Sequence, residues 1–247
     1  MVTESRRETE SRREREIRQR ESQILDIARG QILTAGYLGL NMDRIAAEME
    51  YSKGTIYQHF RNKEEILLAL ANDAQQQRIR MFQAAADSSG RPRERLCAIG
   101  AAAEAFLEQY PHFFMVEQLV RSVSIWEKTS PERRKLMRNC EQRCMAIVVS
   151  IVRDGISVGD LALPPEVTPE DVVFGCWSMN WGGMIIATTS DSLADIGIAH
   201  PGLALHHNMS ALLDGYHWRP LSTEHDYAAH VQRVKQELFP ALEPQAN

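Results

Sequence analysis

The residues best suited to chemistry lie between Asn41 and Leu67. Within this segment the run from Ser52 to His59 is rich in side chains that donate or accept hydrogen bonds: Lys53, Thr55, Tyr57, Gln58 and His59. Such side chains on one exposed helical face bind phosphate oxygens and base edges, and the start of a helix attracts phosphate through its free N–H groups. The segment is therefore predicted to bind a polyanion by entering one of its grooves.

Helix signals indicate how this run is positioned. Asn41 and Ser52 are good N-caps for two short helices, and Asn62 with Glu65 three residues later resembles the capping box of a longer one. Small residues would let the two short helices cross closely, as in a helix-turn-helix: Ala46, Ala47 and Gly54. Four apolar residues are then expected to point inward: Ile45, Met49, Ile56 and Phe60.

The chain before this segment divides into a charged arm and a helix. Residues 2–22 contain ESRRE twice, and their seven arginines and six glutamates leave nothing to build a core. We interpret residues 1–20 as a solvated arm, with a fraying helix and contact with DNA phosphates as alternatives; the glutamates weaken the latter. A helix is predicted from Ile24 onward, and Gly36 is placed to end it.

Residues 21–68 resemble the DNA-binding domain of the TetR family of one-component transcriptional regulators. The resemblance rests on these residues: Ile24 to Ala28, Gly36-Tyr37, Asn41-Met42, Ile45-Ala46, Ser52 to Tyr57, His59-Phe60, Lys63 and Leu67. It implies a three-helix domain whose third helix reads bases. The DNA-contacting residues that it implies are Arg44, Ser52, Lys53, Gly54, Thr55, Tyr57, Gln58, His59 and Lys63. Lys53 would donate to guanine and Gln58 would pair with adenine, while Tyr57, His59 and Lys63 would bind phosphates.

Two positions depart from the family pattern. The turn reads Met49-Glu50-Tyr51 where the family usually has Ala-Gly-Val. This predicts a non-glycine residue in a left-handed conformation, at a cost of about 1 kcal/mol. Gln31 occupies a position that is usually apolar, which predicts a looser or differently packed core at that point.

The rest of the chain is also predicted to be helical, so the fold class is all-α, with a larger C-terminal domain at residues 69–240. Helices are expected at about 63–86, 93–109, 111–127, 131–154, 168–189, 203–217 and 224–239, bounded by Pro, Gly and capping residues. In the family this region binds an effector and forms the dimer.

An effector pocket implied by the resemblance would be lined by aromatic and polar residues of these helices. The expected lining residues are Phe106, Phe113, Gln118, Trp126, Trp177, Asn180 and Trp181. Each of the large apolar residues could equally fill the core. Few buried charges are expected, so the effector is predicted to be a small apolar or aromatic molecule.

Residues 168–189 and 203–217 match in order the two helices that pair in family dimers. Small residues would permit close helix packing, either in a homodimer or only within the monomer: Gly175, Ser178, Gly182 and Gly183.

Composition and missing motifs argue against other classes of protein. The net charge is −5, so any contact with nucleic acid must come from a local patch. We expect no membrane partner and a cytoplasmic location, because no apolar run approaches about 20 residues and the chain starts with a charge run. Four cysteines show no metal-ligand pattern, and no phosphate loop or nucleophile elbow is present. We therefore expect no catalytic residue, metal or cofactor.

The predicted function is a ligand-responsive, DNA-binding transcriptional regulator. The favoured form is a homodimeric repressor that a small effector releases from double-stranded, pseudo-palindromic operator DNA. The alternatives are an activator or a protein-binding regulator on the same scaffold. An enzyme is the least supported class.

Overall fold

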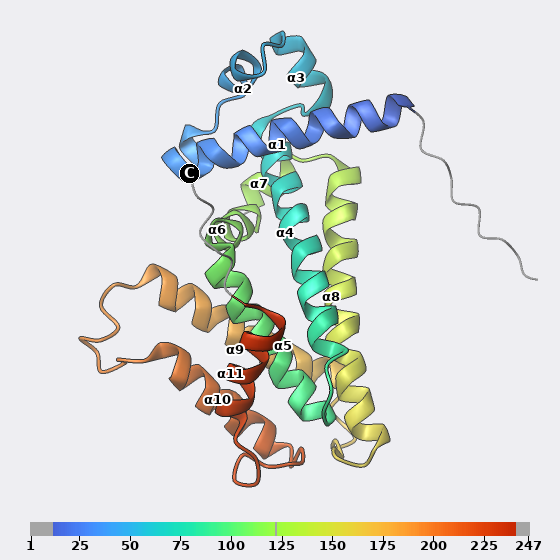
Figure 1. Ribbon diagram of the computed structural model, residues 1–247, viewed down its shortest axis with the longest axis vertical. Helices are drawn as coiled ribbons and strands as arrows, with labels where there is room; N and C mark the ends of the chain where they lie inside the picture. The colour runs from blue at the N-terminus through green and yellow to red at the C-terminus, as the bar shows by residue number, and fades with distance from the viewer. Residues whose placement is uncertain (1–11, 122, 241–247) are drawn as a thin grey trace, which may run out of the picture. The chain divides into compact units, whose positions relative to one another are not determined.

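The computed structural model describes residues 12–121 and 123–240, and all regular structure in these ranges is helical (Figure 1). The helices are α1 (Arg12–Gly39), α2 (Met42–Glu48), α3 (Lys53–His59), α4 (Lys63–Ala86), α5 (Pro92–Gln109), α6 (Pro111–Val120), α7 (Val123–Glu127), α8 (Pro131–Ser157), α9 (Pro169–Thr189), α10 (Pro201–Gly215) and α11 (Tyr227–Leu238). The all-α prediction is confirmed. In the described part of the chain, no helix has the length and apolar character needed to cross a bilayer.

The helix boundaries depart from the sequence predictions at two places. The first helix already begins at Arg12, so residues 12–20 of the expected arm are helical, with an ion pair of 2.9 Å between Arg12 and Glu16. Gly36 has φ of 65° and ψ of −173°, outside the helical region, so it ends the first helical stretch of α1 as predicted. The single helix expected at 111–127 is two helices, with Arg121 in a turn. No glycine or proline marks that break.

The chain forms two compact units. The N-terminal unit comprises residues up to Ala74 together with His112–Met137, and the C-terminal unit comprises Gln75–Pro111 and the chain from Arg138 onward. Residues 112–137, expected in the C-terminal domain, thus pack with the N-terminal helices. The reason is apolar burial, because Val116 and Val120 join the same core as Ile24.

The core of the N-terminal unit explains how the helix-turn-helix is held. The side chains of Ile45, Ile56 and Phe60 are fully buried, and Met49 packs against them while partly exposed. The predicted inward-facing set is therefore confirmed. Figure 1 shows α2 and α3 lying together over α1.

The C-terminal unit is organised around a buried arginine. Arg93 on α5 is 0% exposed, and its guanidinium donates to the main-chain oxygens of Trp218 and Pro220. It lies 2.7 Å from Asp214 and stacks over the ring of Tyr227 at 4.6 Å. Among the described residues of this unit, Arg93 and His230 are the only buried acidic or basic side chains, so buried charge is sparse, as expected.

Candidate nucleic-acid interface

The capping side chains that the sequence indicated form the ends of α2 and α3. The Asn41 side chain accepts hydrogen bonds from the N–H groups of Asp43 at 2.8 Å and Arg44 at 3.2 Å. Ser52 Oγ accepts from the N–H of Thr55 at 3.2 Å. Each cap satisfies donors that a helix start leaves free, which fixes where both short helices begin.

The turn between α2 and α3 has the predicted left-handed residue. Glu50 has φ of 56°, and the following N–H of Tyr51 donates to the carbonyl of Ala46 at 3.0 Å. This bond closes the turn without the glycine usual in the family. The predicted local strain is thus present at Glu50.

Gln31 does not loosen the core, contrary to one of the two expectations for it. Its side chain is 5% exposed, its Oε1 accepts from the N–H of Asn41 at 3.0 Å, and its Nε2 donates to Glu48 at 3.4 Å. A buried amide with both ends bonded positions a neighbouring element at little cost. Gln31 therefore ties α1 to the first residue of the helix-turn-helix.

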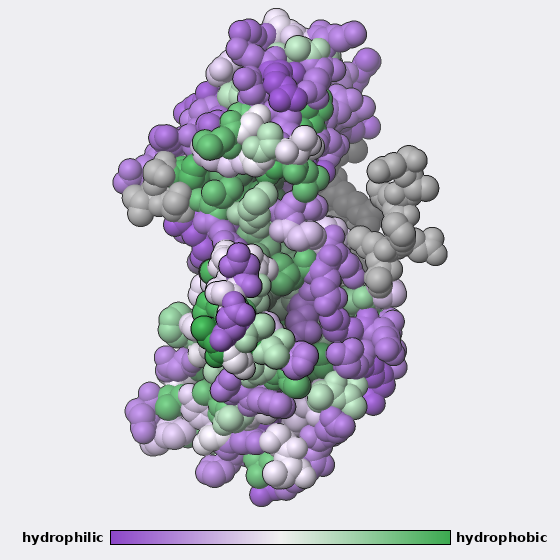
Figure 2. Space-filling view, turned by 90° about the vertical axis from the view of Figure 1, so that its left-hand side faces the viewer, coloured by the Kyte–Doolittle hydropathy of each residue, from purple (hydrophilic) through white to green (hydrophobic). Residues whose placement is uncertain are grey.

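The outer face of α3 is open and polar. Lys53, Gly54 and Gln58 are exposed, Tyr57 is 48% exposed, and Thr55 is half-buried. The surface over α2 and α3, at the top of Figure 2, is mostly hydrophilic. This face presents donors and acceptors beside a backbone that Gly54 leaves uncovered, the combination that base edges and phosphates require.

Acidic residues of α2 neutralise the cations on this face. Lys53 Nζ lies 2.5 Å from Asp43 Oδ2, and Arg44 lies 3.8 Å from Glu48. The hydrogen bond to Asp43 and its charge raise the pKa of Lys53. Lys53 therefore shares its charge with Asp43, which weakens its attraction for a phosphate or a base edge.

His59 does not lie on the open face, so the expectation that it binds a phosphate is corrected. Its side chain is only 7% exposed, and Nδ1 lies 3.7 Å from Glu21 Oε1. The ring occupies the last turn of α3 and points at α1. Packing at the end of a seven-residue helix decided its direction, which spacing alone did not reveal.

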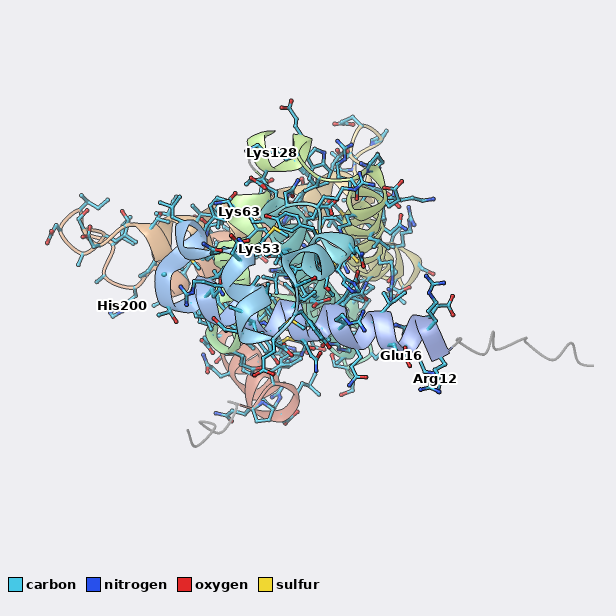
Figure 3. All side chains as sticks on the ribbon, turned by 90° about the horizontal axis from the view of Figure 1, so that it is seen from above. Arg12, Glu16, Lys53, Lys63, Lys128 and His200 are labelled. Carbon is cyan, nitrogen blue, oxygen red and sulfur yellow. The ribbon has the colours of Figure 1, made fainter. Side chains whose placement is uncertain are left out.

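Lys63, predicted to contact a phosphate, is half-buried at the start of α4. Its Nζ lies 4.3 Å from the centre of the Tyr37 ring, and the Tyr37 hydroxyl donates to Glu64 at 3.1 Å. Burial, together with Glu64, raises the pKa of Tyr37 to about 12. Lys128 lies 3.3 Å from the same Glu64 carboxylate (Figure 3). A cation–π contact therefore holds the Lys63 ammonium against the Tyr37 ring.

Sequence reasoning missed Arg133, which holds the end of the recognition helix. Its guanidinium, on α8, donates to the main-chain oxygen of His59 at 3.3 Å, lies 3.4 Å from Glu21, and stacks over Phe60 at 4.4 Å. A cation at a helix C-terminus satisfies free carbonyls and opposes the negative end of the helix dipole. The contact joins residues 74 apart in the chain, so no local signal could have indicated it.

The residues expected to bind an effector are divided between the two units. Phe113 is buried in the N-terminal unit, where Arg29 lies over its ring at 5.4 Å and the two residues line a small crevice with His112. Gln118 and Trp126, in the same unit, are half-buried.

The remaining effector candidates lie in the C-terminal unit. Phe106 is fully buried and shares the guanidinium of Arg78 with Trp181, at 4.5 and 5.9 Å from the two rings. Asn180 is half-buried on the same helix as Trp181. Trp177 is placed differently from the expectation: it is 41% exposed and contacts the exposed ring of Phe174. Apolar character on a helix did not show which side it faced.

Helices α9 and α10 run side by side (Figure 1), and some large apolar side chains of α9 are exposed. Phe174 is 60% and Ile186 54% exposed. Gly183 serves packing inside the unit, because a Cβ there would lie 3.2 Å from Leu205. A Cβ at Gly182 would meet nothing within 4 Å. Of these two glycines, only Gly183 is required for close packing within the unit.

In the described part of the chain, one cluster of side chains consists of residue types that can bind a metal ion. Glu94, His225 and His230 bring one ligand atom each within 4.8 Å of one another. However, one nitrogen of His230 pairs with the main-chain oxygen of Glu94 at 3.1 Å, and the other pairs with Arg233 at 2.9 Å. Both ring nitrogens are already bonded within the protein, so we interpret the cluster as a link between α5 and α11.

An all-helical chain that presents a capped, polar second helix of a helix-turn-helix is a DNA-binding protein by architecture. The profile of the family "Bacterial regulatory proteins, tetR family" matches residues 24–70. Residues 24–70 therefore match the DNA-binding domain of the TetR family, as the sequence resemblance indicated.

Known proteins resemble this chain over most of its length. The Fatty acid metabolism regulator protein of Bacillus subtilis (strain 168) is 24% identical over 187 residues, covering 72% of this chain and 94% of the relative. The crystal structure of the TetR family regulator PfmR from Thermus thermophilus has a TM-score of 0.56 at 22% identity, covering 77% of this chain and 97% of that one. A TetR/AcrR family regulator from Thermobifida fusca has a TM-score of 0.58 at 24% identity, covering 80% and 98%. These structures share its fold.

Proposed function

We propose that the protein is a homodimeric, ligand-responsive repressor that places α3 of each subunit in successive major grooves of a pseudo-palindromic operator. The observation that carries the proposal is the open polar face of α3, held by capped ends and by Arg133. On this proposal Lys53 and Gln58 read base edges, and Tyr57 binds a phosphate. A two-fold dimer would set the half-sites about 34 Å apart.

Dimer formation is proposed through the exposed apolar side of α9, together with α10. Phe174 and Trp177, three residues apart on one side of α9, present large apolar groups that a second copy of the chain would cover. An isologous contact of the two helices with their copies would give the two-fold axis that a palindromic operator requires.

The effector is proposed to be a small molecule with an apolar or aromatic part, bound in the C-terminal unit. Phe106 and Trp181, which share Arg78, are the residues that support a site there. α4 and α8 each continue from one unit into the other and carry Lys63 and Arg133 at their N-terminal ends. An effector that favours one dimer geometry by about 1–3 kcal/mol would release DNA that favours the other.

The experiment begins with selection of bound sequences from a pool of random duplexes by the purified protein. Tyr57→Phe, which removes only a hydroxyl, is expected to weaken binding to the selected operator several-fold. Gln58→Ala is expected to relax the preference at one position of each half-site, by about 1–3 kcal/mol. Gln232→Ala, exposed on α11, is the matched control.

The effector is sought by adding apolar, aromatic and fatty-acid compounds to the protein–operator complex. Release of DNA by a compound that also quenches tryptophan fluorescence would support repression controlled by a ligand. A protein that selects no sequence, or whose selected sequences are unaffected by Gln58→Ala, would contradict the proposed reading of DNA. Tighter DNA binding with a compound would favour an activator or co-repressor arrangement instead.

A further inference from the structure

The N-terminal half of α1 has a strongly basic surface that the helix-turn-helix does not include. Between Arg12 and Arg20 there are five arginines and two glutamates, and the residues before Arg20 are exposed. Glu16 is paired with Arg12 at 2.9 Å. The balance of this stretch is therefore positive although the whole chain carries a net charge of −5.

Two contacts fix this part of α1 beside the recognition helix. The Arg20 guanidinium lies 5.5 Å from the centre of the Tyr51 ring, and Tyr51 directly precedes the N-cap of α3. The next residue, Glu21, lies 3.7 Å from His59 at the other end of α3. Adjacent residues of α1 therefore contact the residues at both ends of α3, so the basic helix continues outward from a fixed position beside it.

The helical repeat divides the arginines between two faces. Arg13 is seven residues before Arg20, close to two full turns, so it lies on the same face about 10 Å away. Arg15 is five residues from Arg20 and lies on the opposite side. Figure 3 shows Arg12 and Glu16 on the part of α1 that is farther from Lys53. The basic surface thus extends beyond the reach of α3 itself.

We propose that Arg13 and Arg20 form a second DNA contact, in which they bind phosphates of the strand flanking the groove that α3 enters. This proposal rests on the proposed DNA binding by α3. The planar guanidinium suits phosphate because it donates two parallel hydrogen bonds and is weakly hydrated. Contacts to phosphate position a protein on the duplex without reading sequence, so this surface adds affinity and not specificity.

The test measures operator affinity across a series of salt concentrations, with the full-length protein and the operator selected by the wild type. Each lost phosphate contact lowers the slope of log K against log salt by about 0.9. Arg13→Ala is expected to lower the slope by about that amount and to weaken binding several-fold at low salt. Arg20→Gln is expected to do the same, and circular dichroism checks that it folds without the stack on Tyr51.

Arg15→Ala is the matched control, because it removes the same charge from the opposite face of the same helix. It should leave the slope nearly unchanged, and all three variants should select the wild-type sequence. An unchanged slope for Arg13→Ala, an equal loss for Arg15→Ala, or an altered sequence preference would each overturn the second contact. Failure of the wild type to bind any duplex would instead overturn the proposed function.

Discussion

Helices α3 and α9 expose opposite kinds of side chain. α3 exposes Lys53, Tyr57 and Gln58, whereas α9 exposes Phe174 and Trp177. A polar face with a nearby cation suits a hydrated polyanion, and a face of large apolar groups suits another protein surface. On the proposed function, DNA binding and self-association therefore use separate surfaces, which can be altered one at a time.

The outer face of α3 and the core of the C-terminal unit also differ in how they use charge. On the DNA face the cations are exposed and pair with acids of the adjacent helix, as Lys53 does with Asp43. In the C-terminal unit Arg93 is fully buried and bonds groups more than a hundred residues away, including the carbonyl of Trp218. Charge is available to a ligand in the first case and holds the fold together in the second.

The largest effect on the free energy of unfolding is expected from removal of the buried charge of Arg93. Arg93→Met removes the donor to Trp218 and Pro220 and leaves the Asp214 carboxylate without its cation. Loss of one member of a buried charged network costs about 3–5 kcal/mol of unfolding free energy. Urea denaturation followed by circular dichroism measures the loss.

Arg95→Met is the matched control for this substitution, because Arg95 pairs with Asp154 nearer the surface of the same unit. It should cost no more than about 1 kcal/mol. Equal losses of unfolding free energy for the two variants would contradict the view that a buried charge stabilises the fold more than an exposed one.

The next effect tests the apolar face of α9. Phe174→Glu places a charge where 60% of the side chain is exposed in one subunit and would be covered in a dimer. The variant is expected to sediment as a monomer and to bind the operator more than ten-fold more weakly, because the two half-sites are no longer bound together. Its circular dichroism should match the wild type.

Leu238→Glu, which is 39% exposed on α11, is the control and should remain dimeric. If Phe174→Glu also stays dimeric at micromolar concentration, α9 is not the association surface and the contrast with α3 fails.

The sequence predicted the helix-turn-helix well because its signals are local. The caps Asn41 and Ser52 and the inward spacing of Ile45 and Ile56 act within a few residues. The roles of Gln31 and Arg133 were not predictable in this way, because their partners are distant in the chain.

The sequence also did not predict the direction in which single side chains point. His59 and Trp177 were assigned by residue type, but one points at α1 and the other lies on the surface. Helical spacing defines a face, whereas tertiary packing decides what covers that face. The polar face of α3 could be predicted because the N-caps Asn41 and Ser52 determine where α2 and α3 begin.

A smaller effect concerns the acid that pairs with Lys53. Asp43→Asn removes a negative charge from the DNA face and frees Lys53 from the ion pair. Operator affinity is expected to rise only a few-fold, since exposed ion pairs are weak. Glu237→Gln, exposed on α11, controls for the change in net charge and should have no effect. Unchanged or weaker binding by Asp43→Asn would mean that the Asp43 pair positions Lys53 for DNA instead of restraining it.

The smallest effect is a pH dependence of stability in the C-terminal unit. His206 on α10 lies 2.6 Å from Glu104 on α5, and Lys235 lies 3.5 Å from the same carboxylate. The hydrogen bond to Glu104 raises the pKa of His206. Burial opposes ionisation of Glu104, but the hydrogen bond from His206 and the charge of Lys235 leave the pKa of Glu104 lowered.

The sign follows from these directions. A raised folded pKa means that the His206 contribution is fully present below the unfolded value of about 6.5 and is lost as pH rises through the folded value. The lowered pKa of Glu104 gives a contribution present above about 4.3 and lost at lower pH. His206→Gln should therefore cost about 1 kcal/mol or less near pH 6 and progressively less toward alkaline pH, whereas His207→Gln, exposed on the same helix, should cost nothing at either pH. A pH-independent cost of His206→Gln would show that the side chain acts by packing, and the charge that links α10 to α5 would then be dispensable, unlike that of Arg93.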